Sequence, residues 1–219
     1  MSRRRLRVVL PLLGLATALI AIDLIVWGGS ALRLFLPRRD PMLRDLRGWF
    51  VELETSPAFR WKVAKSVLVA GLLAAVAFRR RQWWPLAWSL LFANVALAMS
   101  SRYHDRLGSA FADATGISTD ERWGLLVLAL ITGALVLLGL ATAPRSWSTV
   151  QLFVIVVALL GLATVLDVAG DGADTRRSEL AVIHLEAAAE LGMLTIALVH
   201  SVHLLRGGGH EPESEAAAA

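Results

Sequence analysis

The sequence contains no cysteine, and its only two lysines are Lys62 and Lys65 among 219 residues. Without cysteine there are no disulfide bonds and no thiolate metal sites, so a metal ion would need His, Asp or Glu ligands. Several enzyme motifs are also missing: the G-x-x-x-x-G-K-[ST] phosphate loop, the G-x-S-x-G nucleophile elbow and the haem-attachment motif. No late helix has a lysine that could hold retinal. The chain therefore shows no motif for a known reaction.

Long apolar stretches dominate what is present. Hydrophobic residues make up 56% of the chain, against roughly 45–50% in globular domains, and the mean hydropathy is +0.60. The net charge of +4 comes mainly from arginines beside the apolar stretches, which lipid head groups explain better than nucleic acid does. The composition predicts a multi-pass protein in a lipid bilayer with no nucleic-acid partner. Its arginine bias favours a bacterial plasma membrane.

The pattern predicts an all-α integral membrane protein in which residues 1–206 form a single bundle of about six transmembrane helices. A shorter stretch, residues 41–54, spaces apolar residues at helical intervals opposite charged ones, which predicts an amphipathic helix lying in the interface. Residues 102–122 are expected to be an external loop, and residues 207–219 a disordered cytoplasmic tail. The predicted spans are residues 8–28, 61–79, 83–101, 123–143, 149–168 and 180–205.

Two short arginine clusters, Arg3–Arg7 and Arg79–Arg81, set the expected topology. The positive-inside rule places both in the cytoplasm, and they are separated by an even number of predicted crossings. The first apolar run is longer than the core of a signal peptide, so we expect an uncleaved first helix. Both termini are thus predicted to be cytoplasmic.

The last predicted helix carries Glu186, Glu190 and His200 on one side. Ionisable groups at membrane depth are costly and nearly always face a protein interior or a water-filled cavity. This helix should therefore pack against other spans, and Asp23 in the first helix is an expected neighbour. His184 points away from the glutamates and is expected at the membrane interface.

The third helix contributes a further polar face, because residues seven and eleven positions apart return to nearly the same side of a helix. Together these residues predict a polar pocket in the outer half of the bundle. A structural role through hydrogen bonds is the alternative for its acids. The candidate cluster comprises Asp23, Asn94, Ser101, Asp167, Glu186 and Glu190, with Asp105 on the Asn94–Ser101 face.

Four residues have side chains suited to a divalent metal ion: His104, Asp105, Glu186 and Glu190. Nitrogen and oxygen ligands of this kind can hold a cation that activates water. His104 and Asp105 equally fit a solvated helix end, because the apolar run finishes at Ser100.

The segment LLFANVALAMSSRYHDRLG, preceded by VELETSPAFRWKVAK, resembles a group of uncharacterised bacterial multi-pass membrane proteins. That group has a short acidic stretch before one helix, an acidic pair and a His-Glu at the end of the next, and a late glutamate-bearing helix. The chain departs from it at Ala98 and Met99, where the acidic pair would fall. The resemblance implies architecture more than chemistry. The corresponding positions here are Glu52 and Glu54, His104 and Asp105, and Glu186 and Glu190.

Three functional hypotheses remain open at this point. The first is a metal-dependent membrane hydrolase acting on a lipid, built on the candidate metal ligands. The second is a component of a proton-coupled transporter, in which Asp23, Glu186 and Glu190 titrate within the bundle. The third is a non-catalytic scaffold or partner subunit, working as a homo-oligomer or with another membrane protein, whose buried acids fix helix packing.

Overall fold

A computed structural model of the chain describes residues 3–35, 46–49, 55–101, 103–115, 122–143 and 175–206, with isolated positions between 150 and 166. These residues are almost entirely helical, which confirms the predicted all-α class. The helices are α1 (Arg3–Phe35), the 3₁₀ turn η1 (Leu46–Trp49), α3 (Pro57–Arg80), α4 (Trp84–Ser101), α5 (Tyr103–Thr115), α6 (Arg122–Thr142) and α8 (Arg176–Leu205).

Four of these helices are long and apolar enough to cross a membrane: they contain the stretches Val9–Leu32, Pro57–Arg80, Trp84–Ser101 and Ser178–Leu205. Helix α6 adds the shorter apolar stretch Leu126–Thr142. By length and composition the chain is therefore compatible with a multi-pass membrane protein. Most of the span predicted at 149–168 lies outside the described residues, so the count of six stays a prediction.

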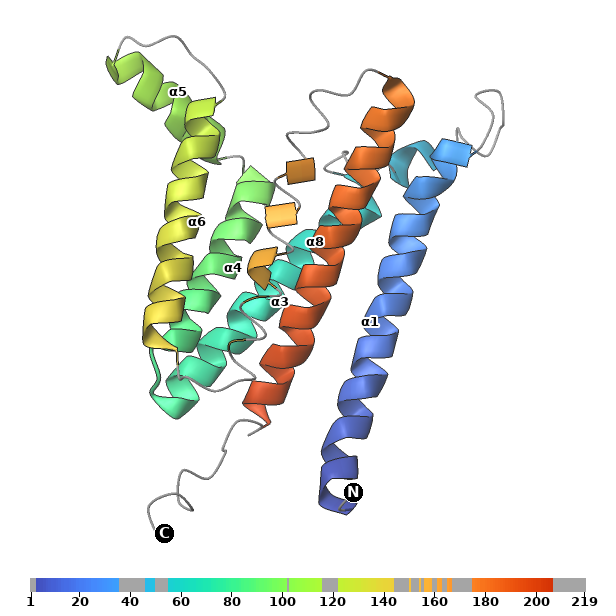
Figure 1. Cartoon of the computed structure of the whole chain (residues 1–219), viewed down its shortest axis with the longest axis vertical. Coiled ribbons are helices and arrows are strands. Elements are labelled where there is room, and N and C mark those ends of the chain that lie inside the picture. The colour runs from blue at the N-terminus through green and yellow to red at the C-terminus, as the bar shows by residue number, and fades with distance from the viewer. Residues whose placement is uncertain are drawn as a thin grey trace.

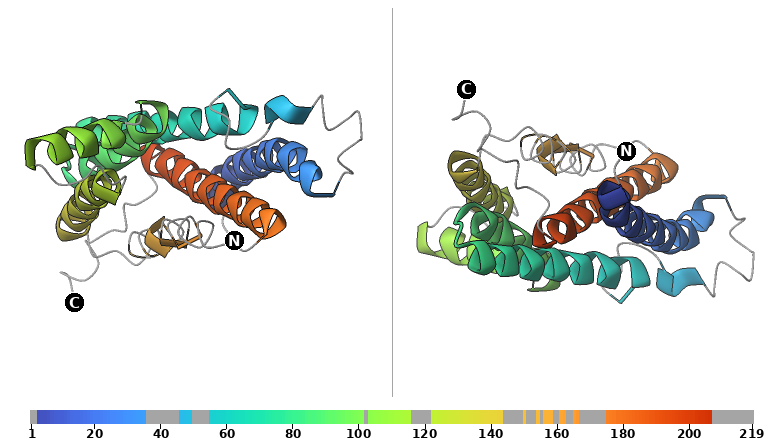
Figure 2. Two further views of the ribbon diagram at one scale, coloured as in Figure 1. Left: turned by 90° about the horizontal axis from the view of Figure 1, so that it is seen from above. Right: turned by 90° about the horizontal axis from the view of Figure 1, so that it is seen from below.

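Helices α3 and α4 form a hairpin, α8 lies against both α1 and α3, and α6 lies against α4 (Figure 1). Seen end-on, α1 and α8 cross one another beside α3 (Figure 2). The start of α1, the turn between α3 and α4, and the end of α8 all lie at the same end of the molecule (Figure 1). The main apolar core lies between these helices and includes Val69, Leu73, Trp88, Leu91 and Leu194.

Helix α3 has a clear start signal in the sequence. Ser56 is its N-cap, accepting a hydrogen bond from the Phe59 backbone N–H at 3.1 Å, and Pro57 occupies the first turn. Helix α8 begins with a capping box in which Thr175 and Ser178 bond to each other's backbone. Both helices therefore start a few residues before the apolar run, because capping residues and not hydropathy decide where a helix begins.

Helix α1 continues to Phe35, beyond the predicted end at residue 28. Asp23 consequently lies about 18 Å along the axis from the end of this helix, at 1.5 Å per residue. The sequence pattern had placed Asp23 close to the outer end. In the structure it lies near the middle of the stretch that could span a membrane.

The expected loop at 102–122 contains α5, which packs against α6. Apolar residues recur here at Tyr103, Leu107 and Phe111, a helical spacing that its charged residues obscured. Helix α4 ends at Ser101 and α5 begins at Tyr103. The Asp105 side chain lies outside the described residues, so the face expected to join Asn94, Ser101 and Asp105 stays a prediction.

Two other predicted segments fall mostly outside the described residues. Of the interfacial helix expected at 41–54, only the 3₁₀ turn Leu46–Trp49 is described. Trp49 of this turn lies close to α1, since a Cβ atom added at Gly29 would be 2.9 Å from its ring. The tail predicted at 207–219 also lies outside the described residues, and both segments remain predictions.

Candidate functional site

An ion pair joins α1 to α3 inside the helix bundle. The Lys65 ammonium lies 2.7 and 2.8 Å from the two carboxylate oxygens of Asp23. Lys65 is fully buried, and Asp23 is 9% exposed. The indole N–H of Trp61 donates a third hydrogen bond to this carboxylate, at 2.7 Å, and the Lys65 ammonium lies 5.5 Å from the centre of the Trp61 ring. Asp23 is thus held by two residues one turn apart on α3.

Helix α8 completes this pair with Thr195. The Thr195 hydroxyl donates to Asp23 at 2.5 Å and accepts from the Lys65 ammonium at 2.6 Å. The Lys65 ammonium also donates to the carbonyl oxygen of Leu191 at 3.0 Å. An ammonium group has three protons, and here they meet Asp23, Thr195 and Leu191. The charged groups therefore have partners from three different helices, and we call Asp23, Lys65 and Thr195, with Trp61, the inner charge cluster.

A second ion pair, Lys62 to Glu190, lies one turn before Lys65 on α3. The Lys62 ammonium is 2.5 Å from a Glu190 carboxylate oxygen, and the two side chains are 11% and 17% exposed. Residues three apart lie on the same face of a helix, so both lysines of the chain face the packed side of α3. We call Lys62 and Glu190 the outer pair.

Further along the same interface, His184 of α8 is buried against α1. Its Nδ1 lies 2.6 Å from the carbonyl oxygen of Leu180 and its Nε2 lies 3.0 Å from the hydroxyl of Ser30. Only a protonated Nδ1 can bond to a carbonyl, so in the neutral ring Nε2 accepts from Ser30. The carbonyl of His184 accepts from the Trp27 indole at 2.8 Å. These α1 partners bury His184 within the bundle, and its expected depth at the membrane interface stays a prediction.

Asn94 and Ser101 lie in another part of the bundle. The Asn94 side chain accepts from the hydroxyl of Tyr103 on α5 and lies 3.5 Å from the hydroxyl of Thr132 on α6. Burial raises the pKa of the Tyr103 hydroxyl, and the hydrogen bond to Asn94 lowers this pKa by less. The hydroxyl therefore stays protonated and donates the hydrogen bond. Ser101 donates to the carbonyl of Leu97 in its own helix, at 2.7 Å. The hydrogen bonds described for these two residues stay within α4, α5 and α6.

Of the remaining predicted site residues, only Glu186 has a described side chain. Glu186 is half-buried on α8, Asp167 lies outside the described residues, and so do the side chains of His104 and Asp105. Within the described ranges there is no group of three or more His, Asp or Glu side chains that could hold a metal ion. The metal site therefore stays a prediction from sequence.

The two lysines are the residues of these ion pairs that sequence reasoning missed. They were counted among the basic residues but not considered as partners for the buried acids. A signal was available, because the only lysines of the chain lie three residues apart inside a predicted span. A charge at that depth requires a partner, and an acid on another span is the simplest one. Thr195 could not have been found in this way, since threonine is common in membrane helices.

No family model matches the chain, and no curated protein or solved structure is significantly similar to it. The resemblance to the group of bacterial membrane proteins therefore remains a prediction. The inner charge cluster and the outer pair have to be interpreted from their own geometry.

Proposed function

We propose that this protein is a non-catalytic component of a membrane, a scaffold or partner subunit, in which the inner charge cluster sets how α1, α3 and α8 pack. The observation that carries this proposal is that the Lys65 ammonium donates hydrogen bonds to three residues of the interface, Asp23, Leu191 and Thr195. A catalytic site needs a position where a substrate or water can bind. Here Asp23 and Lys65 are already occupied by protein groups.

Charged residues suit such a role because they specify an arrangement. Replacing a buried ion pair with apolar residues is often neutral or stabilising, whereas leaving one partner alone is strongly destabilising. In a membrane, Asp23 without Lys65 would place an unpaired carboxylate near the middle of a span. Only the arrangement that joins α1, α3 and α8 avoids this cost, so the cluster penalises incorrect packing of these helices.

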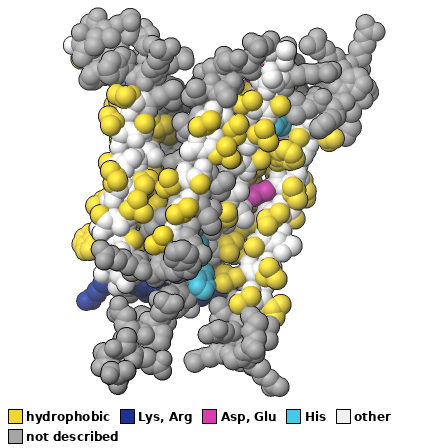
Figure 3. Space-filling model, viewed as in Figure 1, with side chains coloured by type: hydrophobic (Ala, Val, Ile, Leu, Met, Phe, Trp, Pro, Cys, Tyr) yellow, Lys and Arg dark blue, Asp and Glu magenta, His cyan; other side chains and the backbone are white. Residues whose placement is uncertain are grey.

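The proposal includes six membrane crossings with both termini in the cytoplasm, in a bacterial plasma membrane. Three arginine-bearing segments support this topology, because the start of α1, the α3–α4 turn and the end of α8 lie together at one end (Figure 1). Hydrophobic side chains cover much of the described surface, and Lys and Arg side chains gather at its lower end (Figure 3). The partner of this protein would be a second copy of the chain or another membrane protein. This role is compatible with the resemblance of the sequence to a group of bacterial membrane proteins.

Substitution of Asp23 and Lys65 tests the scaffold role. We expect Lys65→Met to unfold more easily in detergent than the wild-type protein, and Asp23→Asn/Lys65→Met to recover most of the stability. Proteoliposomes with the wild-type protein should show no proton flux above empty vesicles under a pH gradient. A wild-type proton flux that disappears in the stable double variant would contradict the scaffold role.

A second candidate, a proton-coupled transporter component, is favoured by one specific observation. The outer pair is partly exposed, and it lies one turn from the buried inner charge cluster on α3. Lys62 and Lys65 lie one turn apart on the same face of α3, so a change of charge at the outer pair would act on the Lys65 ammonium. Acidic groups in such series are typical of proton relays.

Two substitutions of Glu190 distinguish the candidates. Glu190→Gln keeps the hydrogen-bonding capacity but cannot titrate, and Glu190→Leu loses both. A scaffold predicts that Glu190→Gln folds nearly normally while Glu190→Leu misassembles, as measured by size-exclusion chromatography in detergent. A transporter predicts a folded Glu190→Gln protein without pH-driven flux, and equal misassembly of both variants would contradict the scaffold.

A further inference from the structure

The three arginines that end α3 have different environments. Arg79 donates to the carbonyl oxygen of Leu205 at 3.3 Å, and Arg80 donates to that of Leu204. The last carbonyls of a helix lack partners within the helix and carry its negative dipole end. Arg79 and Arg80 are therefore used to close the end of α8. Arg81 has no such bond to a described residue, and its side chain is exposed.

Arg81 also has an unusual backbone. Its φ of 53° and ψ of 40° are left-handed, and no other non-glycine residue of the described ranges has a positive φ. Glycine is the usual residue at this position after a helix. The N–H groups of Arg81 and Gln82 both bond to the carbonyl of Ala77, so the helix ending itself does not require a side chain here. Because a left-handed backbone favours glycine, the arginine found here indicates a role for its side chain.

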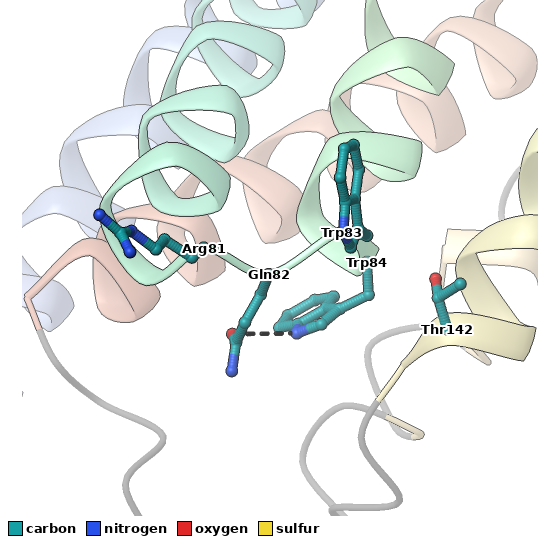
Figure 4. A pocket seen from close by; sticks show the side chains of 5 residues that line it. All are labelled: Arg81, Gln82, Trp83, Trp84 and Thr142. Atoms are coloured by element: carbon teal, nitrogen blue, oxygen red, sulfur yellow. Dashed lines mark hydrogen bonds between the residues drawn. The ribbon is translucent and has the colours of Figure 1, made fainter.

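A pocket of about 420 Å³ opens beside this turn, lined by Arg81, Gln82, Trp83, Trp84 and Thr142. The Trp84 indole donates to the side-chain oxygen of Gln82 at 3.2 Å, which directs the Gln82 amide nitrogen away from the ring (Figure 4). That nitrogen keeps both of its protons for a ligand. Trp83 is 77% exposed, as expected of a tryptophan at head-group level.

The described residues at this end of the molecule carry charge of one sign. Residues 3–8, 79–84 and 203–206 contain arginines but no Asp or Glu. Arg81 and Gln82 follow one another in the turn and offer N–H donors, and the tryptophans and Thr142 form a mainly apolar wall beside them. Figure 4 shows the Arg81 guanidinium directed away from this wall. A phosphate group attached to an apolar chain matches both properties, because guanidinium binds phosphate and indole packs on acyl chains.

We propose that this pocket binds the phosphate of an anionic phospholipid, with Arg81 as its cationic contact and the Gln82 amide as a second donor. Basic pockets between membrane helices are typical sites for anionic head groups. Arg81 has a long exposed side chain next to Gln82 in sequence, so it can turn toward the pocket without backbone change. The proposal does not depend on the role of the inner charge cluster, which lies elsewhere in the bundle.

The test uses the full chain purified in neutral detergent and titrated with phosphatidylglycerol or phosphatidylcholine of the same acyl chains, with bound lipid counted by native mass spectrometry. We expect tighter binding of phosphatidylglycerol. Arg81→Gly should weaken its binding about fivefold, the effect of one arginine near a head group, and leave phosphatidylcholine unchanged. Glycine accepts the left-handed backbone of Arg81, so this variant should fold, whereas Arg81→Lys should keep most of the binding.

Arg60→Gln is the matched control, since Arg60 is an exposed arginine at the opposite end of the same helix. Its phosphatidylglycerol binding should equal that of the wild-type protein. The proposal is overturned if Arg81→Gly binds phosphatidylglycerol as the wild type does, or if Arg60→Gln loses as much. Displacement of the lipid by millimolar inorganic phosphate would also overturn it, because it would identify a site for free phosphate.

Discussion

Helix α3 packs in two different ways on its two sides. Toward α1 and α8 it uses charge, with Lys65 and Lys62 paired to Asp23 and Glu190. Toward α4 it uses close apolar packing and a buried hydrogen bond from the Ser89 hydroxyl to the backbone carbonyl of Ala70 at 2.8 Å. The turn between α3 and α4 is short, so these two helices meet because they are adjacent in sequence. Helices α1 and α8 are more distant in sequence, and the ion pairs specify their contact with α3.

The interface of α4 with α6 shows how far shape alone can specify packing. Trp88 of α4 is buried, and its indole nitrogen would lie 2.3 Å from a Cβ atom added at Gly139 of α6. Only glycine allows this approach, which small residues commonly provide between membrane helices. One side of the bundle is thus specified by charge pairing and the other by the absence of a side chain.

The largest effect should come from breaking the inner charge cluster. Lys65→Met leaves the Asp23 carboxylate buried without its cation, which should lower the free energy of unfolding by about 3–5 kcal/mol. The measurement is reversible unfolding in mixed micelles at increasing SDS fraction. The double variant Asp23→Asn/Lys65→Met should regain most of this loss, and a single variant as stable as the wild type would show that the charges do not specify the interface.

The close approach of α4 and α6 can be broken by one methyl group. Gly139→Ala would force Trp88 or α6 to move, and overpacking of this kind costs about 1–3 kcal/mol. Gly133 is the control on the same helix, because nothing lies within 4 Å of a Cβ atom added there. Gly133→Ala should be neutral or stabilising, by up to about 1 kcal/mol. The same unfolding assay distinguishes the two, and equal effects would contradict the shape-based packing.

The outer pair should stabilise the folded protein less than the inner charge cluster does. Lys62→Gln removes a cation that is 11% exposed and should cost about 1.5 kcal/mol, the lower end for a hydrogen bond between charged groups. Its effect should also fall at high salt, whereas that of Lys65→Met should not, because buried pairs are screened less. If Lys62→Gln lowers the free energy of unfolding as much as Lys65→Met does, and salt does not change this loss, the two ion pairs contribute equally to stability.

The smallest effect is expected on the α4–α5 contact. Tyr103→Phe removes the hydroxyl that bonds to Asn94 and should cost about 0.5 kcal/mol, the lower end for a hydrogen bond, because this contact is only partly buried. A double-mutant cycle with Asn94→Ala measures the coupling between the two residues. A coupling of zero would show that α5 is held by its packing on α6 alone.

The sequence was sufficient for the class of fold and for the approximate positions of most helices, because apolar stretches of membrane length need no tertiary context to be recognised. It failed at α5, where charged residues hid a helical spacing, and at the end of α1, where the helix continues beyond the apolar run. It also indicated that Asp23 and Glu190 need partners, since the cost of a charge at membrane depth is a local property.

What only the tertiary structure decided is which partners they have. Asp23 and Glu190 do not meet in a shared pocket with Asn94 and Ser101, and each is instead paired with a different lysine of α3. Pairing depends on how helices distant in sequence are rotated and how deeply each lies, and neither quantity is encoded by residue type or spacing along one helix. The hydroxyl of Thr195 and the space left by Gly139 acquire their roles only when a second helix lies against them.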